Sequence, residues 1–316
     1  MDVETEMIAA RQATFRKPTR SPFGPADEIG MLNLITPDSR ARVVAEADAR
    51  TCFDLSVDYF VGMPSWLAGG DPAYQLWLSH TPAGQVADDR AAGREPFELM
   101  AYSGDCVSMY THCGTHIDAL NHFGYYGEIW NCFSVAEHLG ARHWHRCGVE
   151  RQPPIVARGL LIDVAASHGV DILPDSYGIG PDDLRQALDR QGSEVRPGDV
   201  VLVRTGRMQV WPDHDAYLLN EPGLNREGAE YLAKAGAIVI GADNIGLDQM
   251  PSVDPENWVP VHTYLFTEAG VAIMEVVHLD EIAAEGVYEF AFIGAALRFR
   301  GATAAPMRPF AFPLRK

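Results

Sequence analysis

Short apolar runs alternate with amphipathic segments along the second half of the chain. Apolar runs of about four to eight residues are typical of buried strands, and longer segments with apolar residues three and four apart are typical of helices. The predicted strands are residues 160–164, 199–204, 237–241, 271–276 and 288–301. The predicted helices are residues 180–190, 225–236 and 260–267. This alternation predicts an α/β fold with a mixed sheet.

The first half of the chain has a weaker pattern. Residues 53–59 alternate apolar and polar positions, which predicts a strand. Start signals and local composition predict helices at residues 4–15, 38–49 and 135–138.

Residues 65–98 show no clear periodicity. They combine scattered Gly, Pro and Asp with Trp66 and Trp77, which predicts an irregular functional loop or lid. No linker, repeat or low-complexity tract divides the chain. We therefore expect a single domain over residues 1–316, in which residues 1–50 form an N-terminal arm against the body or a partner subunit.

Composition excludes several classes of protein. The 316 residues carry 25 basic and 43 acidic side chains, a net charge of −18, with no basic stripe, so we expect no nucleic-acid partner. No apolar run approaches the roughly 20 residues of a membrane span. The acidic start does not resemble a secretory signal, and the five cysteines form no C-x-x-C pair, so we expect free thiols in the cytoplasm.

The chemistry-bearing residues gather between positions 110 and 123. His112, His116, Asp118 and His122 lie at even spacings around Gly114. Imidazoles and a carboxylate are ligands of zinc, manganese or iron. A straight strand would separate His112 from Asp118 by roughly 20 Å, so the backbone has to bend, and Gly114 is the residue free to bend it. We predict a kinked strand or loop whose side chains converge on a metal ion.

Three other interpretations remain open at this point. Each histidine could be a hydrogen-bonded core residue, although four such groups within eleven residues make that less economical. His116, Asp118 and a distant His262 could form the facial triad of a non-haem iron oxygenase. A non-catalytic, metal-stabilised binding protein would hold a fully coordinated ion. The chain contains no dinucleotide fingerprint, Walker lysine motif, G-x-S-x-G elbow or H-E-x-x-H motif.

The motif H-x-G-T-H-x-D-x-x-x-H at residues 112–122 resembles that of the cyclase family of metal-dependent hydrolases, which includes bacterial kynurenine formamidase and isatin hydrolase. The companion segments D-L-S at 54–56, M-P at 63–64, R-G-L-L-I-D-V at 158–164 and G-D-V-V-L-V-R-T-G at 198–206 follow in the family's order. The similarity spans roughly residues 50–300. Leu120 and Asn121 depart from the better-known short members, and the longer N-terminal part resembles a longer-chain branch.

The resemblance implies a swivelling β/β/α fold, a homodimer or homotetramer, and one or two zinc or manganese ions. It implies that His112, His116 and Asp118 bind one ion, and that Asp118, His262 and Glu275 bind a second. His122 would be the general acid/base. The implied activity is hydrolysis of an amide, lactam or lactone carbonyl of a small-molecule substrate by metal-activated water.

The surroundings of the substrate are a separate prediction. Aromatic residues near the motif could stack on a flat substrate; they are Trp66, Phe123, Tyr125, Tyr126 and Trp130. Arg204 ends an apolar strand, where it could meet a substrate carboxylate or form a structural ion pair.

Overall fold

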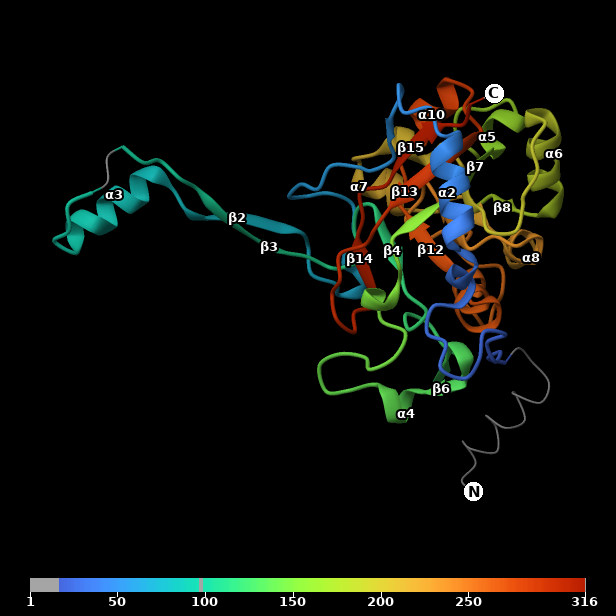
Figure 1. Cartoon of the computed structure of the whole chain (residues 1–316), viewed down its shortest axis with the longest axis horizontal. Coiled ribbons are helices and arrows are strands. Elements are labelled where there is room, and N and C mark those ends of the chain that lie inside the picture. The colour runs from blue at the N-terminus through green and yellow to red at the C-terminus, as the bar shows by residue number, and fades with distance from the viewer. Residues whose placement is uncertain (1–16, 97–98, 316) are drawn as a thin grey trace.

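The computed structural model describes residues 17–96 and 99–315. In these residues the centre of the fold is a nine-stranded sheet in the order β1-β15-β13-β7-β9-β11-β12-β4-β14 (Figure 1). The strands are β1 (Phe53–Asp54), β4 (His116–Asp118), β7 (Ile155–Asp163), β9 (Val200–Arg204), β11 (Val239–Ala242), β12 (Ala272–Glu275), β13 (Glu289–Gly294), β14 (Ala304–Pro306) and β15 (Phe310–Pro313). The middle strands β7, β9, β11 and β12 are parallel, and antiparallel strands extend the sheet on both sides.

Helices cover both faces of this sheet. The α-helices of the body are α2 (Pro37–Glu46), α5 (Val164–Ser167), α6 (Pro181–Gln191), α7 (His214–Leu218), α8 (Arg226–Ala235), α9 (Pro260–Tyr264) and α10 (Asp280–Ala284), while the short α4 (Val135–His138) lies beside β6 (Phe133–Ser134), away from the sheet (Figure 1). Small two-stranded pairs join β8 (Gly178–Ile179) to β10 (Gly223–Leu224), and β5 (Glu128–Ile129) to β6. No helix in the described ranges is long and apolar enough to cross a membrane.

The middle strands are apolar on both sides because both of their faces are covered. In β9, Val201 and Val203 pack into the cluster that contains the apolar residues of α6 and α8. Val200 and Leu202, which point the other way, pack into a second cluster with Ile282 of α10. The α/β fold with a mixed sheet, as predicted, is confirmed.

Most predicted elements correspond to observed ones, with different bounds. The strands predicted at 160–164, 199–204, 237–241 and 271–276 are β7, β9, β11 and β12, while the strand predicted at 288–301 already ends at Gly294. The strand predicted at 53–59 is only two residues long. Helix α2 begins with a capping box, in which Thr36 accepts from the Ser39 amide. The helix predicted at 4–15 lies outside the described residues.

The described N-terminal residues that precede α2 run along the surface of the body and bind to it. The Thr19 amide donates to the Thr267 carbonyl (2.9 Å) and the Met31 amide to the Gly270 carbonyl (2.7 Å). Asp27 accepts from the Trp130 indole at 2.9 Å. These contacts hold the segment against the short helix η6 (Leu265–Ala269) that continues α9, against Gly270 at its end, and against Trp130.

Residues 65–96, the described part of the loop predicted at 65–98, do not form an irregular loop. Strand β2 (Gln75–His80), helix α3 (Pro82–Ala91) and strand β3 (Gly104–Ser108) build a long hairpin extension that projects away from the body (Figure 1). The prediction was wrong because Leu76, Trp77 and Leu78 place apolar side chains on both faces of β2, so the period of two that marks a strand is lost. We call residues 75–96 and 99–108 the hairpin extension.

Candidate metal centre

The histidine-rich stretch bends where the sequence predicted. Gly114 adopts φ +60°, and a Cβ atom there would lie 2.6 Å from the Tyr59 ring, so the turn requires glycine. After the turn, β4 pairs with the end of β12, and His116 lies opposite Glu275. The kinked strand is confirmed. The bend returns His112 toward Asp118, and the strand pairing adds a carboxylate that is distant in sequence.

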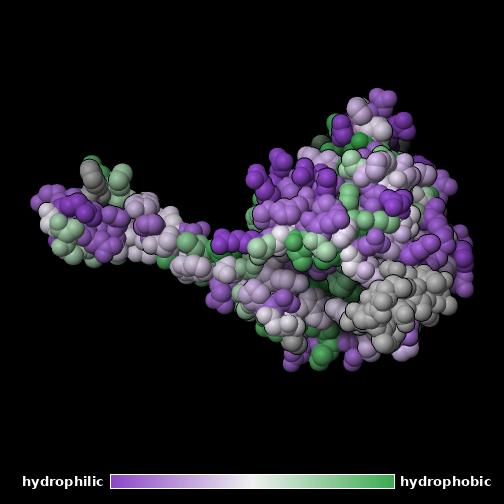
Figure 2. All heavy atoms as spheres, turned by 90° about the horizontal axis from the view of Figure 1, so that it is seen from below, coloured by the Kyte–Doolittle hydropathy of each residue, from purple (hydrophilic) through white to green (hydrophobic). Residues whose placement is uncertain are grey.

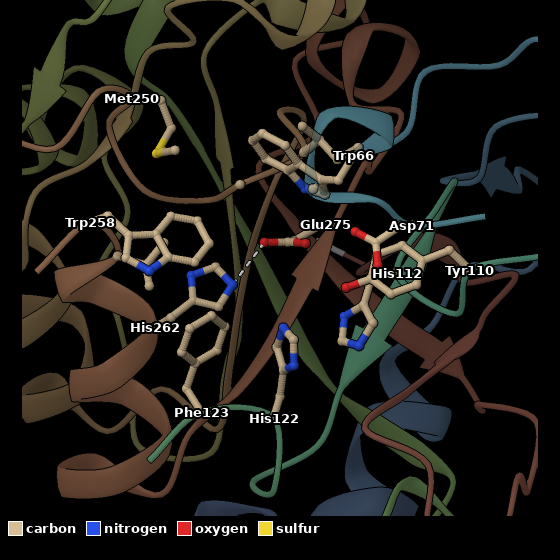
Figure 3. A pocket seen from close by; sticks show the side chains of 14 residues that line it. Trp66, Asp71, Tyr110, His112, His122, Phe123, Met250, Trp258, His262 and Glu275 are labelled. Atoms are coloured by element: carbon tan, nitrogen blue, oxygen red, sulfur yellow. Dashed lines mark ion pairs between the residues drawn. The ribbon is translucent and has the colours of Figure 1, made fainter. Parts of the chain in front are cut away.

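Asp118 lies at the centre of the cluster. Its Oδ1 is 2.8 Å from His112 Nδ1 and 3.3 Å from His116 Nε2, and its Oδ2 is 3.9 Å from His262 Nε2. Glu275 bridges two of the same imidazoles, with Oε2 3.1 Å from His116 Nε2 and Oε1 3.3 Å from His262 Nε2. Figure 3 shows the contact between Glu275 and His262. The structure therefore brings together all five residues predicted as ligands, on elements some 150 residues apart in sequence.

Hydrogen bonds orient two of the imidazoles. His112 Nε2 lies 2.8 Å from the Thr303 hydroxyl, and His116 Nδ1 donates to the Gly114 carbonyl at 2.7 Å. In each ring the nitrogen that is not bonded in this way faces Asp118. A partner on the far nitrogen is the usual means of fixing the tautomer of a metal-binding histidine.

Asp248 orients the third imidazole. His262 Nδ1 donates to Asp248 Oδ2 at 2.6 Å, and the backbone amides of Val261 and His262 donate to the same carboxylate at 2.8 and 3.2 Å. Asp248 is fully buried. Asp248 and Thr303 were not predicted, since neither lies in a local motif with the histidine that it holds.

The donor set fits a divalent cation. The ion-pair contacts around Asp118 lack hydrogen-bonding geometry, and five buried atoms consequently have no hydrogen-bond partner among the described residues. They are His112 Nδ1, His116 Nε2, both carboxylate oxygens of Asp118, and Glu275 Oε1. Each of these side chains is at most 4% exposed, where unpaired polar groups are costly. A bound cation would satisfy them all.

Two overlapping sets of donors share Asp118. His112, Asp118 and His122 form one set, and His116, Asp118 and Glu275 form the other, with the donor atoms of each set within 4.8 Å of one another. The family resemblance implied a different division, in which His116 joins His112 and Glu275 joins His262. The assignment of each residue to an ion stays a prediction.

The electrostatics of the centre favour positive charge. Burial lowers the pKa of His116, but the neighbouring Asp118 and Glu275 carboxylates outweigh it and raise that pKa to about 10. The pKa of His262 is also raised, because Asp248 and Glu275 outweigh the effect of burial. Burial raises the pKa of Asp118, yet its surrounding imidazoles hold it well below its usual range. The same negative field attracts a metal ion.

His122 differs from the other histidines. Its Nε2 is 3.8 Å from Asp118 Oδ2, its ring stacks on His112 with centroids 3.9 Å apart, and its side chain is 18% exposed. Burial, followed by the nearby His112, lowers its pKa well below the usual value. No described residue accepts or donates a hydrogen bond at its ring nitrogens. His122 thus borders the cluster without the fixed orientation of the other rings.

A cavity of about 290 Å³ opens above the cluster and is bordered by His112, His122, His262 and Glu275 (Figure 3). Its aromatic walls are Trp66, Tyr110, Phe123 and Trp258. Of these, Trp66 and Phe123 were predicted, whereas Tyr110 was missed although it lies two residues before His112, and Trp258 was missed because it approaches the site only through the fold. The dimensions suit a small molecule.

The other predicted substrate contacts lie elsewhere. Tyr125 and Tyr126 line a neighbouring cavity that shares Phe123 and Trp258 with the first. Trp130 is a core residue, 1% exposed. Arg204 forms ion pairs with the carboxylates of Asp163 and Asp280 at 3.1 and 2.8 Å, and its role is therefore structural.

The fold is a mixed α/β sheet, and it carries a buried histidine–carboxylate cluster beneath a small cavity. This is the arrangement of a protein with a metal-binding site. Residues 53–249 match the model of the Cyclase family, and the chain belongs to this family.

The chain matches two curated relatives over most of their length. Kynurenine formamidase from Bacillus cytotoxicus is 30% identical over 213 residues, which are 66% of this chain and 79% of the relative. Cyclase-like protein 3 from Oryza sativa subsp. japonica is 24% identical over 259 residues, 81% of this chain and 77% of the relative.

Solved structures have the same fold. A crystal structure described as a novel cyclase superposes with a TM-score of 0.82 at 26% identity, covering 94% of this chain and 100% of the other. Isatin hydrolase A from Ralstonia solanacearum superposes with a TM-score of 0.62 at 19% identity, covering 83% of this chain and 91% of the other.

Proposed function

We propose that this chain is a metal-dependent hydrolase that cleaves the carbonyl–nitrogen bond of a small amide or cyclic amide, or the corresponding ester or lactone bond. The observation that carries the proposal is the set of buried nitrogen and oxygen atoms around Asp118, at the floor of the cavity, that have no hydrogen-bond partner among the described residues. The kynurenine formamidase relative and the isatin hydrolase fold support the same class of reaction.

His112, His116, Asp118, His262 and Glu275 are the residues that would hold one or two zinc or manganese ions. An ion bound there would lower the pKa of a coordinated water and polarise a carbonyl oxygen. The orienting contacts of Thr303, Gly114 and Asp248 keep the ring nitrogens turned toward the cation position, which limits the reorganisation needed on binding.

His122 is the residue placed to carry the proton. Its Nε2 faces Asp118 from the cavity wall at 3.8 Å, and no hydrogen bond from a described residue restrains the ring. In the proposed reaction, water adds to the carbonyl carbon and His122 Nε2 accepts the proton that the water loses. The same nitrogen then donates this proton to the leaving nitrogen or oxygen as its bond to the carbonyl carbon breaks. No serine or cysteine nucleophile is required.

The aromatic walls position the substrate and exclude water. Phe123 packs edge-on against Trp258 with centroids 5.9 Å apart, and against His262 at 5.2 Å. A planar acyl or ring group between these walls would present its carbonyl to the floor of the cavity.

The test is a screen of the metal-loaded protein against formamides, cyclic amides and lactones, in which hydrolysis is measured as proton release. We expect turnover of at least one class without oxygen, loss of turnover with a chelator, and recovery on adding zinc or manganese. Turnover that requires both iron and oxygen would identify an oxygenase instead. A tightly bound metal with no turnover of any carbonyl substrate would support a binding protein.

A further inference from the structure

Asp71 borders the cavity but belongs neither to the metal cluster nor to the proposed proton transfer. It lies on the same side of the cavity as Tyr110 and His112, opposite Trp258 and His262 (Figure 3). Its side chain is partly buried, and no described residue donates a hydrogen bond to its carboxylate or forms an ion pair with it. A carboxylate in this position is available to a molecule that enters the cavity.

The local turn brings the Asp71 carboxylate to the cavity wall. The chain turns at Gly70, which adopts φ +88°. A Cβ atom at Gly69 would lie 3.1 Å from Asp71 Oδ2, so glycine at this position leaves room for the carboxylate. The hairpin extension begins four residues after Asp71 and projects away from the body (Figure 2). The shape of the turn, rather than an ion pair with a described residue, therefore places the charge.

Aromatic rings border the cavity beside this carboxylate. Trp66 lies five residues before Asp71, and Tyr110 is close enough for the charge of Asp71 to act on its phenol. The faces of Trp and Tyr rings attract a cation that lies within about 6 Å of the ring centroid. Carboxylate and rings together suit an ammonium group, since the carboxylate accepts its hydrogen bonds and the rings contact its remaining surface.

The cavity offers no comparable site to an anionic group of a substrate. Among the described residues that border it, none is Lys or Arg. The net charge of −18 also disfavours the approach of anions. With one divalent ion bound, the carboxylates of Asp118, Asp248 and Glu275 still carry more charge than the ion, so the cluster would not repel a substrate cation. The cavity therefore favours a cationic substrate.

We propose that Asp71 selects substrates that carry a protonated amine, which it binds against Trp66 and Tyr110 while the scissile carbonyl faces the metal cluster. Asp71 thus recognises the substrate and takes no part in the proton transfer. The choice of substrate rests on the proposed hydrolase activity, whereas binding of a cation at Asp71 can be measured without turnover.

Binding of an unreactive cation is the first test. Titration calorimetry on the metal-loaded protein at pH 7 compares benzylammonium with its neutral counterpart, benzyl alcohol. We expect benzylammonium to bind at least about tenfold more tightly, the effect of one hydrogen bond to a charged group. Asp71→Asn should abolish this difference and keep its melting temperature, because the residue has no ion pair with a described residue to lose.

Asp58→Asn is the matched control. It removes the same charge from an exposed residue that borders a different cavity, so the preference for benzylammonium should remain. Equal binding of the two probes by the unaltered protein would overturn the proposal. A preference that survives Asp71→Asn would overturn it as well, since the amine would then bind elsewhere, for example to the metal.

Turnover is the second test. Within the class of substrate that the screen identifies, matched compounds would differ only in an aminomethyl, hydroxymethyl or carboxyl substituent. We expect the aminomethyl compound to have the highest kcat/KM, at least about tenfold above the hydroxymethyl compound, through a lower KM at similar kcat. Asp71→Asn should remove this advantage and leave the hydroxymethyl compound unchanged.

Two outcomes of the turnover test would refute the role of Asp71. One is a higher kcat/KM for the carboxyl compound, and the other is an unchanged order of preference in Asp71→Asn. Absence of turnover with every carbonyl substrate would instead count against the proposed hydrolase activity. The calorimetric comparison would then still decide whether Asp71 binds a cation.

Discussion

His262 donates its Nδ1 proton to Asp248 Oδ2 across 2.6 Å, which leaves Nε2 directed at Glu275 and Asp118. Asp248 follows β11 and His262 lies in α9, so the pair links the end of the parallel sheet to the metal cluster. Both side chains are buried, at 0% and 5% exposure. The carboxylate therefore sets the direction of the imidazole rather than taking part in the cluster itself.

Asp248→Asn should weaken metal binding. The amide keeps the size of the side chain but loses the charge that holds the Nδ1 proton, so we expect affinity for zinc or manganese to fall about 10–100-fold. Competition with a chromophoric chelator measures this directly. Asp280→Asn, at a carboxylate bound to Arg204 away from the cluster, is the control and should keep its affinity. Equal affinities in the two variants would remove Asp248 from the site.

His122→Ala and His116→Ala should separate proton transfer from metal binding. We expect His122→Ala to retain its metal while its rate falls about 10²–10⁴-fold, the usual contribution of a general acid/base. His116→Ala removes a fully buried donor and should lose metal as well as activity. Metal content by mass spectrometry and kcat on the same samples check both. Full activity of His122→Ala would contradict its assigned role.

Removal of the metal should destabilise the protein. Without a cation, the buried oxygens of Asp118 and the Glu275 Oε1 atom have no hydrogen-bond partner in the part of the chain that the structure describes. A cation at 100 times its dissociation constant adds about 2.7 kcal/mol to the free energy of unfolding. We expect the melting temperature to fall by several degrees with a chelator and to recover with excess metal. His116→Ala should show little response to either addition; an equal response would place the ion elsewhere.

Asp27 should make stability sensitive to acid. Burial raises its pKa, but hydrogen bonds from Ser21, Trp130, Ile29 and Asn33 leave it below the ordinary value. This contribution to stability is therefore present above about pH 4, the pKa in the unfolded chain, and is lost as the pH falls through the lower folded-state pKa.

Asp27→Asn tests this contribution. Its amide group would face donors, and we expect about 1–3 kcal/mol of lost stability at neutral pH. Urea unfolding between pH 2 and 7 should also show a weaker acid dependence. Asp88→Asn, at an exposed position in α3, is the control. If the two variants match the parent at every pH, the hydrogen bonds of Asp27 do not stabilise the fold.

Arg204→Met should affect stability rather than substrate binding. The guanidinium is 8% exposed and neutralises Asp163 and Asp280, so its loss leaves a buried carboxylate unpaired. Breaking such a pair costs about 3–5 kcal/mol. We expect a lower midpoint of urea unfolding with KM unchanged for substrates with and without a carboxylate. A rise in KM confined to carboxylate substrates would restore Arg204 as a substrate contact.

Local sequence was sufficient to predict the central strands and the bend in the histidine-rich stretch. The strands β7, β9, β11 and β12 were predictable because strands buried on both faces are continuous apolar runs. The bend at Gly114 was predictable because closely spaced ligands cannot converge from a straight strand. His262 and Glu275 came only from the family resemblance, since a lone histidine and a lone glutamate carry no local signal.

Tertiary structure decided the rest. Glu275 faces His116 because a three-residue strand adds antiparallel to β12, and no property of either segment encodes that pairing. Thr303 reaches His112 from 191 residues away. The hairpin extension was hidden because apolar residues on both faces erase its periodicity. The residues between 110 and 123 thus determined which chemical groups are available, through their types and spacing. Only the sheet order determined which groups meet, because contacts between distant segments depend on the packing of the whole chain.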